Sequence, residues 1–170
     1  EKIKILSNAL SYTLPDFDIH LIYNYRLSWA ELSLLTNIAI NYQSIDPNKS
    51  ILYFSKILDY CGLNSFDICF TATFLSPVLT FFCINLYIDK HFYKLLDLFS
   101  EKYFSAQKKV LCNLGYFFFY YAQALGEVHN YTMVKCYGHY ACAIQELYET
   151  KPNSDVLKEY LLKDFDITLV

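Results

Sequence analysis

The sequence predicts an all-α protein built from stacked helical hairpins. Apolar residues recur at the spacing of one helix face along most of the 170 residues. No segment of useful length alternates polar and apolar residues as a half-buried strand does. Only four residues are glycine, which argues against many tightly turned strand pairs. Together these observations favour helices joined by short connections.

The first elements expected are N-terminal helices within residues 2–24, followed by a hairpin over 28–62. Ser28 and Glu31 have the spacing of a capping box, which begins a helix. An apolar stripe follows at positions i, i+3, i+4 and i+7, as on one helix face. The stripe consists of Leu35, Ile38, Ala39 and Tyr42.

The second helix of this hairpin is expected to begin at Asp46 and Pro47 and to end at Gly62. Aspartate is a favoured N-cap residue, and proline is common at the first helical position. Glycine commonly follows the last helical residue. Between these signals, Ile51, Phe54, Leu58 and Cys61 supply the apolar stripe.

Two further hairpins are expected over residues 65–104 and 107–150, with Pro152 ending the last one. A short helix over 154–163 should follow. The breaks inside the three hairpins are expected at the N-cap residues Asp46, Asp89 and Asn130, which are 43 and 41 residues apart.

A period of about 40 residues with two helices per unit is typical of helical-repeat proteins, and the tetratricopeptide type, with a period of about 34, is nearest. We therefore expect one domain over residues 1–170 with a tetratricopeptide-like right-handed superhelix.

Composition limits the class of protein. Hydrophobic residues make up 55% of the chain and charged residues 18%, which excludes intrinsic disorder. The 21 residues from Ile68 to Ile88 carry no charge and are long enough to span a bilayer. Pro77 and several Ser, Thr and Asn residues in this stretch favour instead a buried helix kinked at Pro77. We expect no membrane association.

The six cysteines have no CxxC spacing, so neither a zinc site nor a thioredoxin-like motif is indicated. They lie in apolar helical runs, and we expect reduced, buried thiols in a cytoplasmic protein. The net charge is −3 and Arg26 is the single arginine, so DNA binding by this segment itself is not expected.

No cofactor, metal site or catalytic motif is expected. The sequence has no glycine-rich phosphate loop, GxSxG motif or HExxH motif. Cys136 and His139, three residues apart with Glu146 two turns further on, are the one conceivable nucleophilic pair. We interpret them instead as a buried thiol beside a surface histidine.

The charges separate the two helices of each hairpin. The first helices are uncharged over residues 32–45, 68–88 and 110–126, whereas the second helices carry ordinary numbers of Lys, Asp and Glu. Each uncharged helix has a polar or aromatic stripe at helical spacing. The residues of these stripes that are candidates for contacting a ligand are Asn37, Asn41, Thr80, Tyr87, Asn113, Tyr116, Tyr120 and Gln123.

Two interpretations of these stripes stay open. They are either the inner packing face of a small superhelix or the lining of a groove that binds an extended peptide. Asn and Gln amides offer donors and an acceptor to a peptide backbone, and tyrosine adds apolar area with a polar tip. Asn37 and Asn41 favour the groove, because two amides on one helix face fit an apolar core poorly.

The N-terminal third resembles a known family. The segment NALSYTLPDFDI, residues 8–19, and the segment LSWAELSLLTNIAINYQSIDPNKSILYFSKIL, residues 27–58, are similar to the start of the repeat region in Rgg- and PlcR-type regulators of Firmicutes. These are helix-turn-helix transcription regulators with a tetratricopeptide-like C-terminal domain that senses peptides. Ile51 and Leu95 depart from the pattern, because tetratricopeptide hairpins usually have alanine at these positions.

The resemblance implies a function. A helix-turn-helix domain would precede Glu1, while the repeat domain would bind a short signalling peptide and form a homodimer. Peptide binding would then shift the pose of the DNA-binding domains. By position in the motif, Asn37 is the residue that the resemblance assigns to the peptide backbone. A stand-alone protein-interaction scaffold and an all-α enzyme are the alternatives.

Overall fold

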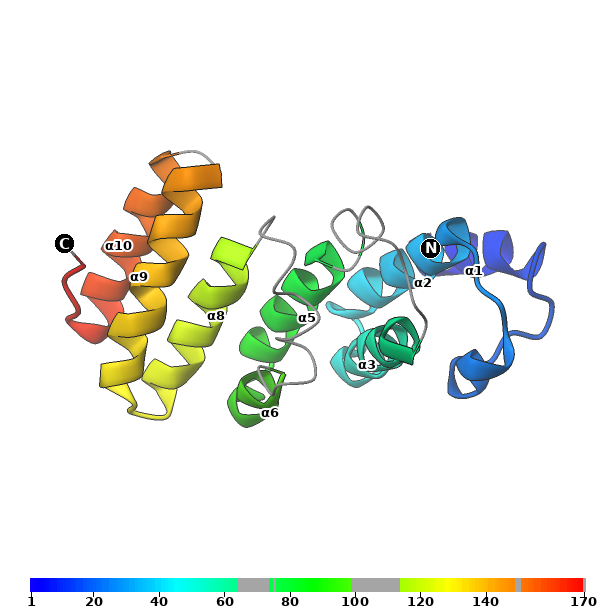
Figure 1. The fold of residues 1–170 in the computed structure, drawn as a ribbon. Helices are drawn as coiled ribbons and strands as arrows, with labels where there is room; N and C mark the ends of the chain where they lie inside the picture. The colour runs from blue at the N-terminus through cyan, green and yellow to red at the C-terminus, as the bar shows by residue number, and fades with distance from the viewer. Residues whose placement is uncertain (64–73, 75, 99–113, 149–150, 170) are drawn as a thin grey trace. The chain divides into compact units, whose positions relative to one another are not determined.

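The computed structural model describes residues 1–63, 74, 76–98, 114–148 and 151–169 (Figure 1). All regular elements in these ranges are helices and none is a strand, which confirms the all-α fold class. The chain divides into two compact units, Glu1–Phe70 and Thr71–Val170. We call them unit 1 and unit 2.

Within residues 1–63, unit 1 contains three α-helices and a 3-10 helix. They are α1 (Lys2–Ser11), η1 (Ile19–Asn24), α2 (Trp29–Tyr42) and α3 (Pro47–Leu63). Helix α2 packs against both α1 and α3, and η1 packs against α3. The large side chains that are fully buried in this unit are Ile22, Leu32, Leu35, Ile38, Phe54 and Ile57.

The start of α2 confirms the capping box. The Glu31 N–H donates to Ser28 Oγ at 3.3 Å, and the Ser28 N–H donates to Glu31 Oε2 at 2.6 Å. The hydrogen bond from the Ser28 N–H lowers the pKa of the Glu31 carboxyl. The capping box therefore determines where the helix that carries Asn37 begins.

The start of α3 also follows the sequence. The Lys49 N–H donates to Asp46 Oδ1 at 3.1 Å, so Asp46 caps this helix and Pro47 is its first residue. Gly62 lies in the last described turn of α3 and does not have a positive φ. The expected stop at Gly62 is therefore not made by a left-handed glycine.

The described part of unit 2 contains α5 (Ser76–Ile88), α6 (Phe92–Asp97), α8 (Leu114–Glu127), α9 (Tyr131–Tyr148) and α10 (Lys151–Phe165). Helix α8 packs against α5, α6, α9 and α10, and α9 packs against α10 (Figure 1). The large side chains fully buried here are Leu79, Phe82, Leu86, Leu95, Phe117 and Leu161.

Two prolines of unit 2 lie in first turns of helices. Pro77 is the second residue of α5 and Pro152 the second residue of α10. Proline fits there because the first N–H groups of a helix have no partner within it. The segment that would precede a kink at Pro77 lies largely outside the described residues.

The turn after α5 differs from the expectation. The N-cap of α6 is His91 rather than Asp89, because Lys90 takes a left-handed conformation with φ 59°. The Lys90 N–H donates to the Tyr87 carbonyl at 3.0 Å and the His91 N–H to the Leu86 carbonyl at 2.8 Å. These two bonds form a Schellman motif that ends α5 at Ile88, and α6 begins two residues later than an Asp89 cap would place it.

We predict that Lys90→Gly raises the free energy of unfolding of unit 2 by about 0.5–1 kcal/mol. Glycine adopts positive φ without the steric cost that a Cβ brings, and it is the usual residue at this position of the motif. The control is Glu159→Gly on the exposed face of α10, which should lower stability by about 0.5–1 kcal/mol. Denaturant unfolding of both variants would test the opposite signs.

Candidate functional site

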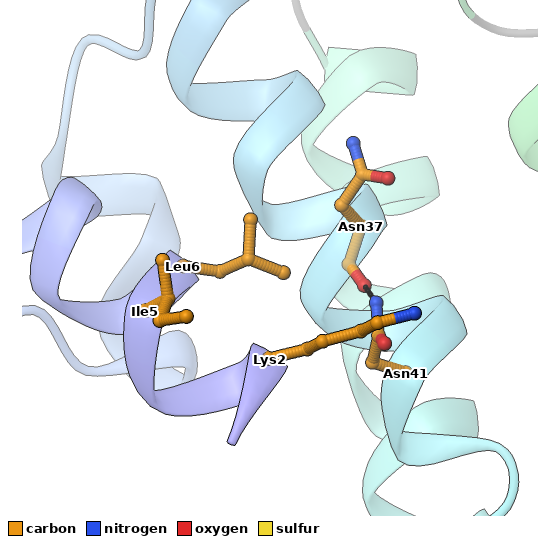
Figure 2. Close-up of a pocket in the computed structure, with 5 residues that line it drawn as sticks. All are labelled: Lys2, Ile5, Leu6, Asn37 and Asn41. Carbon is orange, nitrogen blue, oxygen red and sulfur yellow. Dashed lines mark hydrogen bonds between the residues drawn. The ribbon is translucent and has the colours of Figure 1, made fainter.

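A pocket of about 330 Å³ lies between α1 and α2 in unit 1 (Figure 2). Lys2, Ile5 and Leu6 of α1 form one side, and Asn37 and Asn41 of α2 form the other. Figure 2 shows the Leu6 and Lys2 side chains extending from α1 toward α2. Two of the eight candidate residues thus line a pocket together.

The two asparagine amides are fixed by the backbone of α2. Asn37 Nδ2 donates to the Ser33 carbonyl at 2.9 Å. Asn41 Nδ2 donates to the Asn37 carbonyl at 2.7 Å, the bond drawn in Figure 2. Each bond reaches back one helical turn to the carbonyl of residue i−4, which is a known partner for a short polar side chain in a helix. Among the described residues, no hydrogen bond is made to either amide oxygen. Each amide group thus keeps its oxygen as a possible acceptor for a ligand beside α2.

The chemistry of the pocket combines three kinds of group. The Asn37 and Asn41 amides can accept from peptide-like N–H groups, and the Lys2 ammonium attracts anionic groups. Ile5 is an exposed apolar side chain at the rim. The volume lies at the lower end of the range for pockets that hold small ligands. The pocket therefore combines hydrogen-bonding amides, one positive charge and apolar side chains.

Tyr87 and Tyr120 come together in unit 2. Their ring centroids are 5.8 Å apart, which joins α5 to α8. The Tyr87 hydroxyl lies 3.3 Å from that of Tyr160 on α10, and the Tyr160 ring packs edge-on against Phe119 at 5.4 Å. Helix α10 thus places the Tyr160 hydroxyl against Tyr87 and its ring against Phe119.

Burial governs the tyrosine chemistry. Desolvation raises the pKa of Tyr87, Tyr120 and Tyr160, so all three phenols stay neutral near pH 7. Tyr87 Oη also donates to Glu127 Oε1 at 3.4 Å. The cluster therefore provides hydrogen bonds and apolar area rather than charge.

The other candidates of unit 2 lie at different depths. Thr80 and Tyr116 are half-buried on α5 and α8. Gln123 is 2% exposed, and its Oε1 makes no hydrogen bond among the described residues. Asn113 lies outside those residues. The stripe on α8 thus includes one interior residue, Gln123. At this position the stripe belongs to the packing face, which is one of the two interpretations that the sequence left open.

Sequence reasoning missed two contributions to these sites. The first is α1, whose residues Lys2, Ile5 and Leu6 complete the pocket at Asn37. The spacing of Ile3, Leu6 and Leu10 is the signal that could have placed α1 against the next helix. The second is Tyr160, for which the sequence offers no local signal.

The alternative nucleophilic pair is not assembled. Cys136 is exposed, not buried as expected, because it lies on the outer face of α9. No hydrogen bond between Cys136 and His139 occurs in the described structure, and Glu146 Oε1 instead accepts from Ser154 at 2.8 Å and from Lys158 at 2.9 Å.

The buried cysteines are free thiols, namely Cys61, Cys83 and Cys142, while Cys69 and Cys112 lie outside the described ranges. Burial raises the pKa of the Cys61 thiol to about 12, which keeps it protonated and unreactive. Across the described ranges, no three His, Cys, Asp or Glu residues gather as a metal site would need.

No helix in the described part of the chain has the length and apolar character needed to cross a bilayer. Most of the uncharged stretch before Pro77 lies outside that part. Comparisons with protein-family models, curated proteins and solved structures give no match. The functional assignment therefore rests on the residues and geometry of the chain itself.

Proposed function

We propose that this chain is the ligand-sensing and dimerisation domain of a cytoplasmic transcription regulator, and that it binds a short signalling peptide. The observation that carries the proposal is the pair of oriented amides, Asn37 and Asn41, on an uncharged helix face at a pocket. Support also comes from the resemblance of residues 8–19 and 27–58 to Rgg- and PlcR-type regulators.

In this proposal the peptide lies against α2 with its backbone N–H groups pointing at the amide oxygens. Each oxygen is held in place before binding, so little side-chain entropy is lost when the peptide binds. Apolar peptide side chains would contact Ile5 and Leu6, and an acidic group or C-terminus would lie near Lys2. DNA would be contacted by a separate helix-turn-helix domain of the regulator.

The mechanism proposed is a change in how α1 packs on α2. Helix α1 contributes three of the five pocket residues but only one buried side chain, Leu10. Few buried contacts make an element easy to displace. A peptide that contacts both helices would stabilise one packing of α1 over others, and any domain attached to α1 would respond.

The proposal predicts that Asn37→Ala weakens peptide affinity about tenfold, because one hydrogen bond to a ligand is worth about 1.4 kcal/mol. Folding should be unaffected, since Asn37 is exposed and alanine favours helix. The measurement is fluorescence polarisation with short labelled peptides selected from a random library on the unmodified chain.

The matched control is Asn48→Ala, which removes an exposed asparagine of α3 away from the pocket. It should leave affinity unchanged. Equal affinities for the Asn37→Ala and Asn48→Ala variants would contradict the proposal, and so would a failure to select any binding peptide. Unfolding of the Asn37→Ala variant would instead assign Asn37 to the packing of unit 1.

A second candidate is a stand-alone protein-interaction scaffold. It is favoured by large apolar side chains exposed on unit 1, namely Tyr12, Trp29 and Ile45. Such residues are enriched at protein interfaces. Selection of a folded protein partner whose binding is lost with Trp29→Ala but not with Asn37→Ala would support the scaffold over the peptide sensor.

A further inference from the structure

Helix α9 carries a stripe of exposed apolar residues at regular spacing. Met133, Tyr140 and Leu147 are 36%, 53% and 75% exposed, and they follow one another at intervals of seven residues. Cys136 and Ala143 are also exposed and lie between them, again seven residues apart. This is the a and d pattern of a helix that packs along a second helix. We call these five residues the α9 stripe.

The stripe faces away from the packing of unit 2. Val134, Ala141 and Gln145 on the opposite side of α9 are buried. Phe118 of α8 lies beside the stripe, with its ring centroid 6.0 Å from that of Tyr140, and Tyr137 is 5.8 Å from Tyr140. These contacts hold the Tyr140 ring in place, so a partner would meet a preorganised aromatic anchor.

The stripe is nearly symmetric about Tyr140 along the helix. Met133 lies seven residues before it and Leu147 seven after, while Cys136 and Ala143 lie four before and three after. Two charges of opposite sign lie at similar, though not equal, distances from Tyr140 along the helix. Lys135 lies five residues before Tyr140 and Glu146 six after, and both are exposed on the same side of α9, next to the stripe.

We infer that the α9 stripe is a homodimer surface, in which α9 packs antiparallel against α9 of a second copy across a twofold axis at Tyr140. Met133 then meets Leu147 of the second copy, and the two Tyr140 rings meet at the axis. An isologous contact of this kind needs a self-complementary surface, which the near symmetry of the stripe provides.

Charge decides the direction of the two helices. In an antiparallel pair Lys135 lies near Glu146 of the second copy, on both sides of the axis. A parallel pair would place the two copies of each residue on opposite sides of the seam, so Lys135 would not meet Glu146 of the second copy and this attraction would be lost. Glu146 keeps its contacts with Ser154 and Lys158, so Lys135 adds to an existing cluster.

The size of the surface sets the expected strength. One helix pair buries less than the roughly 800 Å² per partner of a standard stable interface. We therefore expect a dissociation constant in the micromolar range for this contact alone. The inference rests on the dimerisation that is part of the proposed function and assigns it to unit 2, whereas peptide binding is assigned to unit 1.

Cysteine cross-linking tests the axis directly. In the Cys136→Ala, Tyr140→Cys variant of the full chain, mild oxidation should give a covalent dimer whose disulfide joins residue 140 to residue 140. Peptide mass spectrometry would identify that bond. Oxidation of the unmodified chain should not join Cys136 to Cys136, because these residues lie away from the axis in opposite directions. A Cys136–Cys136 disulfide, or no bond at residue 140, would overturn the inference.

Analytical ultracentrifugation tests the surface without oxidation. Leu147→Lys should weaken self-association at least tenfold, since it places a charge in the stripe. Tyr93→Lys on α6 is the matched control, because Tyr93 is also 75% exposed in unit 2, and it should associate as the unmodified chain does. A chain that stays monomeric at high concentration, or equal association by both variants, would overturn the inference.

Peptide binding to the same variants separates the two proposals. Leu147→Lys should keep the peptide affinity of unit 1 when measured at a concentration where the chain is monomeric. Loss of dimerisation with peptide binding retained supports both assignments. Dimerisation through the α9 stripe in a chain that binds no peptide would overturn the proposed sensor while leaving this surface in place.

Discussion

Gly138→Ala is expected to lower the free energy of unfolding of unit 2 by about 1–2 kcal/mol, although alanine favours helix more than glycine does. Gly138 lies where α10 crosses α9. A Cβ at this position would come within 2.7 Å of Leu161 Cδ1 and 3.2 Å of Leu169 Cδ1. Leu161 is fully buried, so it has little room to move aside.

Gly62→Ala in α3 is the matched control for this substitution. A Cβ there meets nothing within 4 Å, and Gly62 has no positive φ. The change should raise the stability of unit 1 by about 0.5–1 kcal/mol. Denaturant unfolding of both variants, followed by circular dichroism, would measure the difference. Stabilisation by Gly138→Ala would contradict the close packing of α9 and α10.

Gln145→Met is expected to stabilise unit 2 by about 2 kcal/mol. Gln145 is fully buried on α9, and neither atom of its amide group has a hydrogen-bond partner in the described structure. A buried polar group without a partner costs about 1–3 kcal/mol, whereas methionine has a similar shape and no such requirement. The two residues have nearly equal helix propensities.

Gln43→Met provides the comparison for Gln145. Gln43 is half-buried at the end of α2, where its amide can reach water, so the change should have an effect within about 0.5 kcal/mol. Thermal and denaturant unfolding would report both values. Destabilisation by Gln145→Met would show that the buried amide has a polar partner in solution.

The sequence predicted those features that are decided by neighbouring residues. The capping box of Ser28 and Glu31 and the Asp46 cap with Pro47 were found because each signal acts within one turn of the chain. The predicted N-cap of α6, Asp89, was wrong. Lys90 is left-handed, and a lysine in that conformation has no sequence signature comparable to that of glycine.

Features that depend on contacts between distant segments could not be predicted in the same way. The exposure of Cys136 depends on which face of α9 meets α8 and α10, and an apolar residue on the outer face resembles one in the core. Gln123 is the opposite case, because it is a polar residue that the structure buries. The pocket at Asn37 likewise exists because α1 packs on α2, which residues 29–42 alone do not specify.

The pairing of Asn37 with Asn41 could be predicted because residues four apart share a helix face. What the structure adds is the direction of each amide, since the hydrogen bonds to the backbone of α2 leave the oxygens as acceptors. Whether a stripe residue faces a pocket or the core therefore differs from one helix to another. The Asn37 end is open to a pocket, whereas Gln123 is interior.

The most direct test of the proposed sensor is to map where a bound peptide lies. A selected peptide with a photoreactive side chain would be irradiated in complex with the full chain, and mass spectrometry would locate the label. We predict labelling on α1 and α2 around Lys2, Leu6 and Asn41, and its loss in the Asn37→Ala variant but not in Asn48→Ala. Labelling confined to unit 2, or unchanged labelling with Asn37→Ala, would contradict the account.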